Sequence, residues 1–188
     1  MKWHRSALAC AAVLTALALT ALTTMTANAG PSFLGYWVNE NASKCLGVLD
    51  ANMANGTPVV QWGCDGTPNQ DWIIATPNGF PGNNIQTPLR NAQNSTKCLG
   101  VFNSATGDGA NLVIWDCNGS ADQEWDLQQV TAPGGSYPDG CYTIANVNAF
   151  PKVLGIFDAN PANGAQAVIW DNLHHLDQIW CPSPPPIG

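Results

Sequence analysis

The chain has 188 residues, with 6 Lys and Arg against 13 Asp and Glu, so its formal net charge is −7 at pH 7. This balance argues against nucleic acids and anionic membrane surfaces as partners, because affinity for phosphate groups comes mainly from Lys and Arg. Charged residues make up only 10% of the chain, whereas Asn, Gln, Thr, Gly and Trp are plentiful. That composition suits hydrogen bonding to neutral polar ligands.

Residues 1–29 are typical of a secretory signal peptide. Lys2 and Arg5 precede an apolar stretch over residues 7–22, and Ala-Asn-Ala at 27–29 offers the small residues that a signal peptidase requires. The apolar stretch is too short and too rich in Thr to predict a membrane span, and no second long apolar run follows. We therefore expect a secreted protein that starts at Gly30, is not inserted in a membrane, and carries four basic and thirteen acidic residues, a formal charge of −9.

Three copies of one sequence unit make up most of the remaining chain. They begin with Lys-Cys-Leu-Gly-Val at 44–48, Lys-Cys-Leu-Gly-Val at 97–101 and Lys-Val-Leu-Gly-Ile at 152–156. In every unit one Trp lies 18 residues after the Lys and another lies 28 residues after it, with no gap in between. Equal units that cannot each bury a core predict one closed, pseudo-threefold domain.

Each unit contains the signals of strands and turns. Apolar runs such as 45–49 and 58–62 are separated by Asn-Gly, Asp-Gly and Pro-containing turns, and no long amphipathic helical stripe is present. The linking segments 73–96 and 126–151 should hold the remaining strands and the variable loops. We expect an all-β domain over 30–181, with repeats at about 34–80, 86–130 and 139–181, followed by an extended Pro-rich tail over 182–188.

Six of the seven cysteines lie after residue 29, and an even number in an exported chain predicts disulfides. Six cysteines allow fifteen pairings, which the repeats narrow. Two Cys pairs are each separated by 19 residues, and the third unit lacks both members of the pair, with Val153 and Asn172 in their places. The repeats therefore predict the pairs Cys45 with Cys64, Cys98 with Cys117, and Cys141 with Cys181. We expect neither a metal site nor a cofactor, because no Cys-x-x-Cys pair exists.

The triple Gln-x-Trp at 70–72, 123–125 and 178–180, together with the strands before it, resembles the hallmark of ricin B-type β-trefoil domains. The resemblance covers nearly all of the chain after residue 29. It implies a β-trefoil of about twelve strands with up to three shallow sugar sites, one per unit, for galactose-type sugars, xylan or other glycans. It also implies a structural role for the motif itself: Gln70, Trp72, Gln123, Trp125, Gln178 and Trp180.

The resemblance places candidate sugar contacts at two other positions in each unit. The stacking position holds Trp62, Trp115 and Trp170, and an indole face suits the apolar face of a sugar ring, although plain packing explains these residues equally well. The position before the Gln holds Asn69, Asp122 and Asp177, whose side-chain oxygens suit sugar hydroxyls or the capping of a turn.

The sequence departs from the ricin-type pattern at two positions in all three units. An Asp that normally accepts hydrogen bonds from the sugar is replaced by Gly47, Gly100 and Gly155, and a Gln is replaced by Val60, Val113 and Val168. Three residues beyond the glycines stand Asp50, Asn103 and Asp158, which we expect to supply the missing acceptor. Units one and three should then be the better sites, because they keep Asp there, and each single site should bind weakly.

Two other classes of function compete with sugar binding. An enzyme is not expected, because glycoside hydrolysis needs two carboxylates across a cleft and the acids here lie on repeat-equivalent turns. The pair His174-His175 fits an exposed loop better than a metal or acid–base cluster. A protein-binding β-trefoil, such as a protease inhibitor or a secreted interaction factor, is the alternative, with contacts in the linking segments. In either case we expect a monomer.

Overall fold

The computed structural model describes residues 32–75, 84–130 and 140–184. The expected signal peptide and residues 185–188 of the expected tail lie outside the described residues. Within the described part, no helix is long and apolar enough to cross a membrane.

The described residues form thirteen strands that divide among the three units. The first unit holds β1 (Ser32–Asn39), β2 (Lys44–Val48), β3 (Val59–Trp62) and β4 (Trp72–Ala75). The second holds β5 (Ile85–Pro88), β6 (Arg90–Asn91), β7 (Asn94–Val101), β8 (Ala110–Asp116) and β9 (Glu124–Gln129). The third holds β10 (Tyr142–Asn146), β11 (Val153–Ile156), β12 (Ala165–Trp170) and β13 (Trp180–Ser183).

Short 3-10 turns stand at the same two places in every unit. One follows the strand at the start of the repeated unit (β2, β7 or β11, called the Lys strand below after the Lys in or just before it), at Leu49–Ala51, Phe102–Ser104 and Phe157–Ala159. The other precedes the Trp of Gln-x-Trp, at Pro68–Gln70, Ala121–Gln123 and Leu176–Gln178. The strand count exceeds the expected twelve because Leu89 divides the first strand of unit two into β5, which pairs with β9, and β6, which pairs with β4 and β7.

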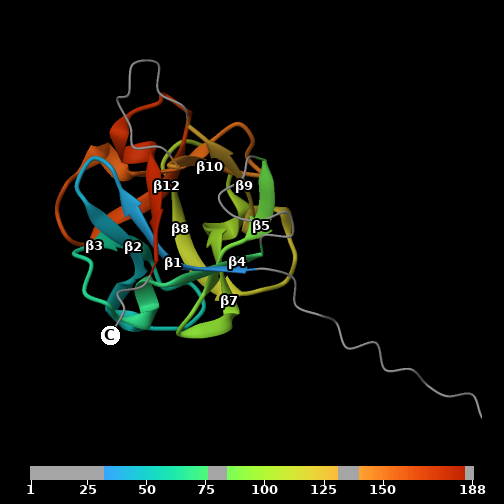
Figure 1. The fold of residues 1–188 in the computed structure, drawn as a ribbon. Coiled ribbons are helices and arrows are strands. Elements are labelled where there is room, and N and C mark those ends of the chain that lie inside the picture. Colours follow the sequence, from blue (N-terminus) through green and yellow to red (C-terminus); the bar gives the residue numbers. More distant parts are fainter. Residues whose placement is uncertain (1–31, 76–83, 131–139, 185–188) are drawn as a thin grey trace, which may run out of the picture.

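The strands close into one pseudo-threefold body (Figure 1). The repeated hairpins β2–β3, β7–β8 and β11–β12 meet where β12 pairs with both β3 and β8. The first and last strands of the units pair around them, with β1 bound to β4 and β13, and β9 bound to β5 and β10. This is the β-trefoil that the repeats and the family resemblance predict.

The last strand extends beyond the expected end of the domain. Tyr36 and Trp37 of β1 pair with Ser183 and Pro182, so β13 continues two residues past Cys181. Pro182 has no N–H to donate, but β1 supplies backbone partners on both sides of it. Those two residues therefore belong to the sheet and not to the tail.

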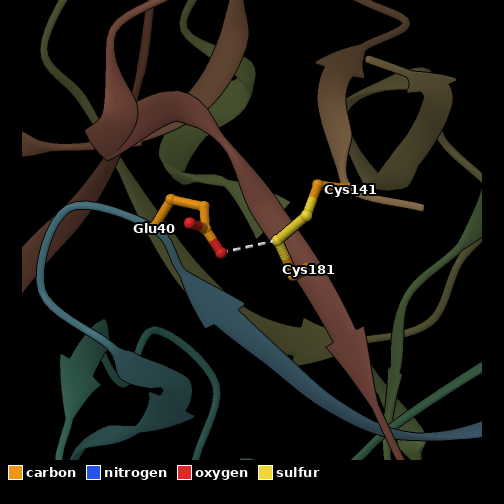
Figure 2. Close-up of side chains that lie close together, drawn as sticks. All are labelled: Glu40, Cys141 and Cys181. Atoms are coloured by element: carbon orange, nitrogen blue, oxygen red, sulfur yellow. Dashed lines mark hydrogen bonds between the residues drawn. A yellow bond between two sulfur atoms is a disulfide. The ribbon is translucent and has the colours of Figure 1, made fainter. Parts of the chain in front are cut away.

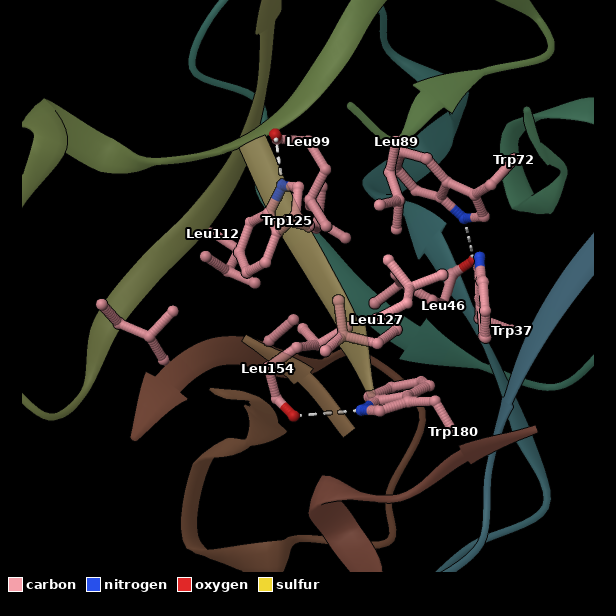
Figure 3. Close-up of a cluster of buried hydrophobic side chains, with 14 of the residues drawn as sticks. Trp37, Leu46, Trp72, Leu89, Leu99, Leu112, Trp125, Leu127, Leu154 and Trp180 are labelled. Carbon is pink, nitrogen blue, oxygen red and sulfur yellow. Dashed lines mark hydrogen bonds between the residues drawn. The ribbon is translucent and has the colours of Figure 1, made fainter. Parts of the chain in front are cut away.

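The Gln-x-Trp motifs hold the interior together. Trp72, Trp125 and Trp180 are fully buried, and their indole N–H groups donate to the carbonyl groups of Leu46, Leu99 and Leu154 at 2.9, 3.0 and 3.1 Å (Figure 3). Each Gln bridges the preceding turn, because its amide donates to one backbone carbonyl and its oxygen accepts from one N–H: Gln70 with Gly63 and Asp65, Gln123 with Asp116 and Asn118, Gln178 with Asp171 and Leu173. Each motif thus contributes one large core side chain and one satisfied buried amide.

The three disulfides join the cysteines that the repeats pair. They are Cys45–Cys64, Cys98–Cys117 and Cys141–Cys181. In the third, a carboxylate oxygen of Glu40 lies 2.8 Å from Sγ of Cys181 (Figure 2). Glu40, Cys141 and Cys181 lie close enough to suggest a metal cluster, but metal ligation requires a thiolate, and the disulfide uses both sulfur atoms.

Candidate functional site

Three hollows open on the surface at equivalent places in the three units. We call them pockets one, two and three after their units, and their volumes are about 400, 220 and 160 Å³. Each lies between the 3-10 turn after the Lys strand and the Trp at the end of the middle strand. The nine predicted contact residues fall into these pockets, three to each: Asp50, Trp62 and Asn69; Asn103, Trp115 and Asp122; Asp158, Trp170 and Asp177.

The floor of each pocket is a Gly–Val pair beside the exposed Trp. Gly47 and Val60, Gly100 and Val113, and Gly155 and Val168 line pockets one, two and three, and all six residues are buried. Trp62 is 42% exposed, Trp115 is 39% exposed and Trp170 is half-buried. The Trp residues of Gln-x-Trp are fully buried, so the two sets of Trp differ in exposure. Trp62, Trp115 and Trp170 line the pockets, whereas the Trp residues of Gln-x-Trp do not.

A turn from a neighbouring unit packs against the ring of each pocket Trp. A Cβ on Gly164 would lie 3.5 Å from the ring of Trp62, one on Gly56 would lie 3.5 Å from Trp115, and one on Gly109 would lie 3.4 Å from Trp170. These glycines have φ angles of +81°, +86° and +79°, which L side chains rarely adopt. The indole therefore rests against a turn whose backbone can approach closely.

The residue before each of these glycines ties the turn to the neighbouring unit. Asn55 donates to Asp116 (2.8 Å) and accepts from Lys97 (2.6 Å), Asp108 accepts from Lys152 (2.6 Å), and Asn163 accepts from the N–H of Gly63 (3.1 Å). The Asn-Gly and Asp-Gly pairs, which in sequence signal only hairpin turns, therefore also support the pocket-lining Trp of another unit.

The floor glycines leave space for the carboxylates that enter from the opposite side. A Cβ on Gly155 would lie 3.3 Å from Oδ2 of Asp177 and 3.1 Å from Cγ of Gln178, and one on Gly100 would lie 3.5 Å from Oδ2 of Asp122. In pockets two and three a carboxylate therefore lies near the position at which the ricin-type pattern has an Asp.

Pocket one differs because its equivalent residue is an amide. Nδ2 of Asn69 donates to the carbonyl of Val48 (3.0 Å), and its Oδ1 lies 2.6 Å from the hydroxyl of Thr67. Both ends of Asn69 are therefore engaged within the protein. The acidic groups left to face a ligand in pocket one are Asp50 and Asp65.

Asp50, Asn103 and Asp158 form the outer rim of the pockets. Each is exposed and sits inside a 3-10 turn with φ of 53° or 54°. Asn and Asp adopt this left-handed region more readily than other residues with a side chain. These side chains therefore border the pockets from the solvent side.

The charged groups that line the pockets are acidic. Lys and Arg are absent from the described residues that line the three hollows, and Lys97 and Lys152 are held by carboxylates elsewhere. Burial raises the pKa of Asp177, and hydrogen bonds from backbone N–H groups lower it in part. Each pocket thus offers acceptor groups beside an indole.

Two positions in the pocket walls were not predicted from the sequence. At 21 residues after each Lys stand Asp65, Asn118 and Leu173, and at 23 residues stand Thr67, Ser120 and His175; all six line their pockets. His175 is exposed, as expected for a loop, but it also borders pocket three. Equal spacing from the Lys was a usable signal for both positions.

Comparisons with known proteins agree with the β-trefoil fold. Residues 33–180 match the ricin-type beta-trefoil lectin domain. Among solved structures, the designed threefold-symmetric protein ThreeFoil is 26% identical with a TM-score of 0.67, and the match covers 79% of this chain and 96% of ThreeFoil. No curated relative matches the chain significantly.

Two further solved structures share the fold. An exo-beta-1,3-galactanase from Clostridium thermocellum is 24% identical with a TM-score of 0.68, over 80% of this chain but only 30% of the galactanase. The ricin B-like lectin of Macrolepiota procera, solved in complex with lactose, is 16% identical with a TM-score of 0.60, over 81% of this chain and 96% of the lectin.

Proposed function

Because the chain belongs to the ricin-type β-trefoil lectin family, we propose that it is a secreted, non-catalytic carbohydrate-binding protein whose pockets take neutral sugars. The observation that carries the proposal is the repeated pairing, in three equivalent hollows, of a partly exposed Trp with Asp or Asn side chains. An indole packs against the apolar C–H face of a sugar ring, while carboxylate and amide oxygens accept hydrogen bonds from its hydroxyl groups.

The charge of the pockets favours neutral over acidic sugars. Asp50 and Asp65 line pocket one, Asp122 lines pocket two, and Asp158 and Asp177 line pocket three, without a lining Lys or Arg among the described residues. A sialic or uronic acid would place its carboxylate beside these groups, where like charges repel. Neutral galactose-type sugars or xylan chains fit better, and the lactose complex of the Macrolepiota procera lectin supports the former.

Each pocket should bind weakly, and the three together should bind well. The hollows are shallow and have apolar floors, so single-site dissociation constants in the millimolar to high micromolar range are expected. Three sites on one rigid body raise the avidity for a polysaccharide without any new contact. Pocket three brings Asp158 and Asp177 together, which supports the expectation that unit three is among the better sites.

A glycan array tests this proposal, with a protease panel beside it. The wild-type protein should bind neutral glycans, should bind sialylated and uronic-acid glycans less, and should release no reducing sugar from any of them. Trp62→Ala, Trp115→Ala and Trp170→Ala should each weaken binding and leave the fold intact, because Trp62 and Trp115 are exposed and Trp170 is only half-buried. Inhibition of a protease without glycan binding would instead favour the protein-binding alternative.

A further inference from the structure

The three pockets share a floor but differ in one wall. At the position where pockets one and two have Asp65 and Asn118, pocket three has Leu173, whose side chain is 51% exposed. Asp65 and Asn118 also stabilise their turns, because each Oδ1 accepts the N–H of the residue two positions later. Unit three does not need this cap, since Asn172 accepts the N–H of His174 at 3.1 Å.

The side chain at position 173 is therefore not needed to cap the turn, and it lines the pocket instead. A large apolar side chain that is half exposed at the edge of a concave site favours an apolar ligand group, because covering both removes apolar surface from water. Trp170, which lines the same pocket as Leu173, has the ring of Phe157 at 6.4 Å and an angle of 67°. Pocket three thus combines apolar surface with the polar groups of Asp177 and His175.

We propose, given the sugar-binding function above, that pocket three takes glycosides with an apolar aglycone, whereas pockets one and two take the sugar ring alone. The ring packs on Trp170 with its hydroxyl groups toward Asp177, and the aglycone packs on Leu173. Phe102, which stands at the position of Phe157 in the sequence, lines pocket two, whereas Phe157 packs against Trp170 and is not among the residues that line pocket three. Two wall positions distinguish pocket three from pocket two, with His175 in place of Ser120 and Leu173 in place of Asn118, and Leu173 is the apolar one.

The size of the effect follows from the apolar area that the aglycone covers. An aryl group that buries about 50 Å² of apolar surface against Leu173 should bind about tenfold more tightly than a methyl group on the same sugar. In pockets one and two the same aryl group would meet Asp65 or Asn118. There the two glycosides should bind equally well.

The test compares matched methyl and p-nitrophenyl β-glycosides of galactose, glucose and xylose on the whole protein. The indole N–H signals of Trp62, Trp115 and Trp170, assigned by Trp→Phe variants, report the three pockets separately in NMR titrations. We expect a p-nitrophenyl preference at Trp170 only. Leu173→Asn should abolish the p-nitrophenyl preference at Trp170, and Asn118→Leu should create a preference at Trp115.

The outcomes separate the inference from the proposed function. If all three indoles respond to sugars but no pocket distinguishes the two glycosides, this inference is wrong and the sugar-binding function stands. If free p-nitrophenol binds pocket three as tightly as the glycoside does, the inference is also wrong, because the sugar then contributes nothing. If no indole responds to any glycoside, both are wrong.

Discussion

Replacing Gly155 with the Asp that the ricin-type pattern has at this position should weaken sugar binding in pocket three and not strengthen it. In Gly155→Asp, the new Cβ would lie 3.1 Å from Cγ of Gln178 and 3.3 Å from Oδ2 of Asp177. Both contacts are tighter than ordinary packing, and the first involves a buried Gln that bridges two backbone groups. Overpacking of this kind costs about 1–3 kcal/mol.

The added charge brings a second cost. Two carboxylates about 4 Å apart repel by about 1 kcal/mol in bulk water and about 4 kcal/mol at an effective dielectric constant of about 20. Burial already raises the pKa of Asp177, and a neighbouring carboxylate should raise it further. We therefore expect weaker sugar binding in pocket three of Gly155→Asp at neutral pH.

Urea unfolding and NMR titration of the pocket-three indole provide the assay. Gly155→Ala is the matched control, since it introduces the Cβ without the charge and should lose stability but retain most of the binding. Tighter binding by Gly155→Asp with unchanged stability would refute the claim that the carboxylate of Asp177 has taken over the role of the missing Asp.

Three other predictions follow from the burial, pKa and disulfides of particular residues. Trp125→Ala removes a fully buried core side chain and should lower the free energy of unfolding by about 3–5 kcal/mol, whereas Trp115→Ala, at 39% exposure, should cost far less stability but abolish binding at pocket two; urea unfolding and glycan titration compare them. Burial raises the pKa of Asp177 in the folded protein above its unfolded value, so its contribution to stability is present below the unfolded pKa and is lost as the pH rises through the folded pKa. Sugar hydroxyl groups donate to the ionised form of Asp177, so the affinity of pocket three should fall as the pH drops through that raised pKa. Glycan titrations from neutral pH to about pH 4 measure this fall. Replacing both Cys45 and Cys64 with Ala opens a bridge with a sequence separation of 19 and should cost about 3 kcal/mol by thermal or urea unfolding; a loss below about 1 kcal/mol would contradict this reading.

Much of the architecture could be predicted from the sequence because the spacing from the Lys to the last Trp is the same in all three units. The constant spacing from Lys to Trp, together with the joint loss of both cysteines from unit three, predicted the pseudo-threefold fold and the disulfide pairs. Two boundaries were not predictable, since they depend on partners distant in sequence. β13 reaches Ser183 because Tyr36 and Trp37 pair with its end, and the first strand of unit two divides at Leu89 because its halves pair with different strands.

The sequence alone determined which residue types recur and where. It could not decide which Trp faces solvent, since that depends on whether the side chain points into the shared core or against a turn of another unit. It also could not show that Asp122 and Asp177 approach the floor glycines, or that Leu173 and His175 form a pocket wall. Those relations exist only when three units close on one another, because each pocket takes its floor and walls from one unit and the support of its Trp from a second.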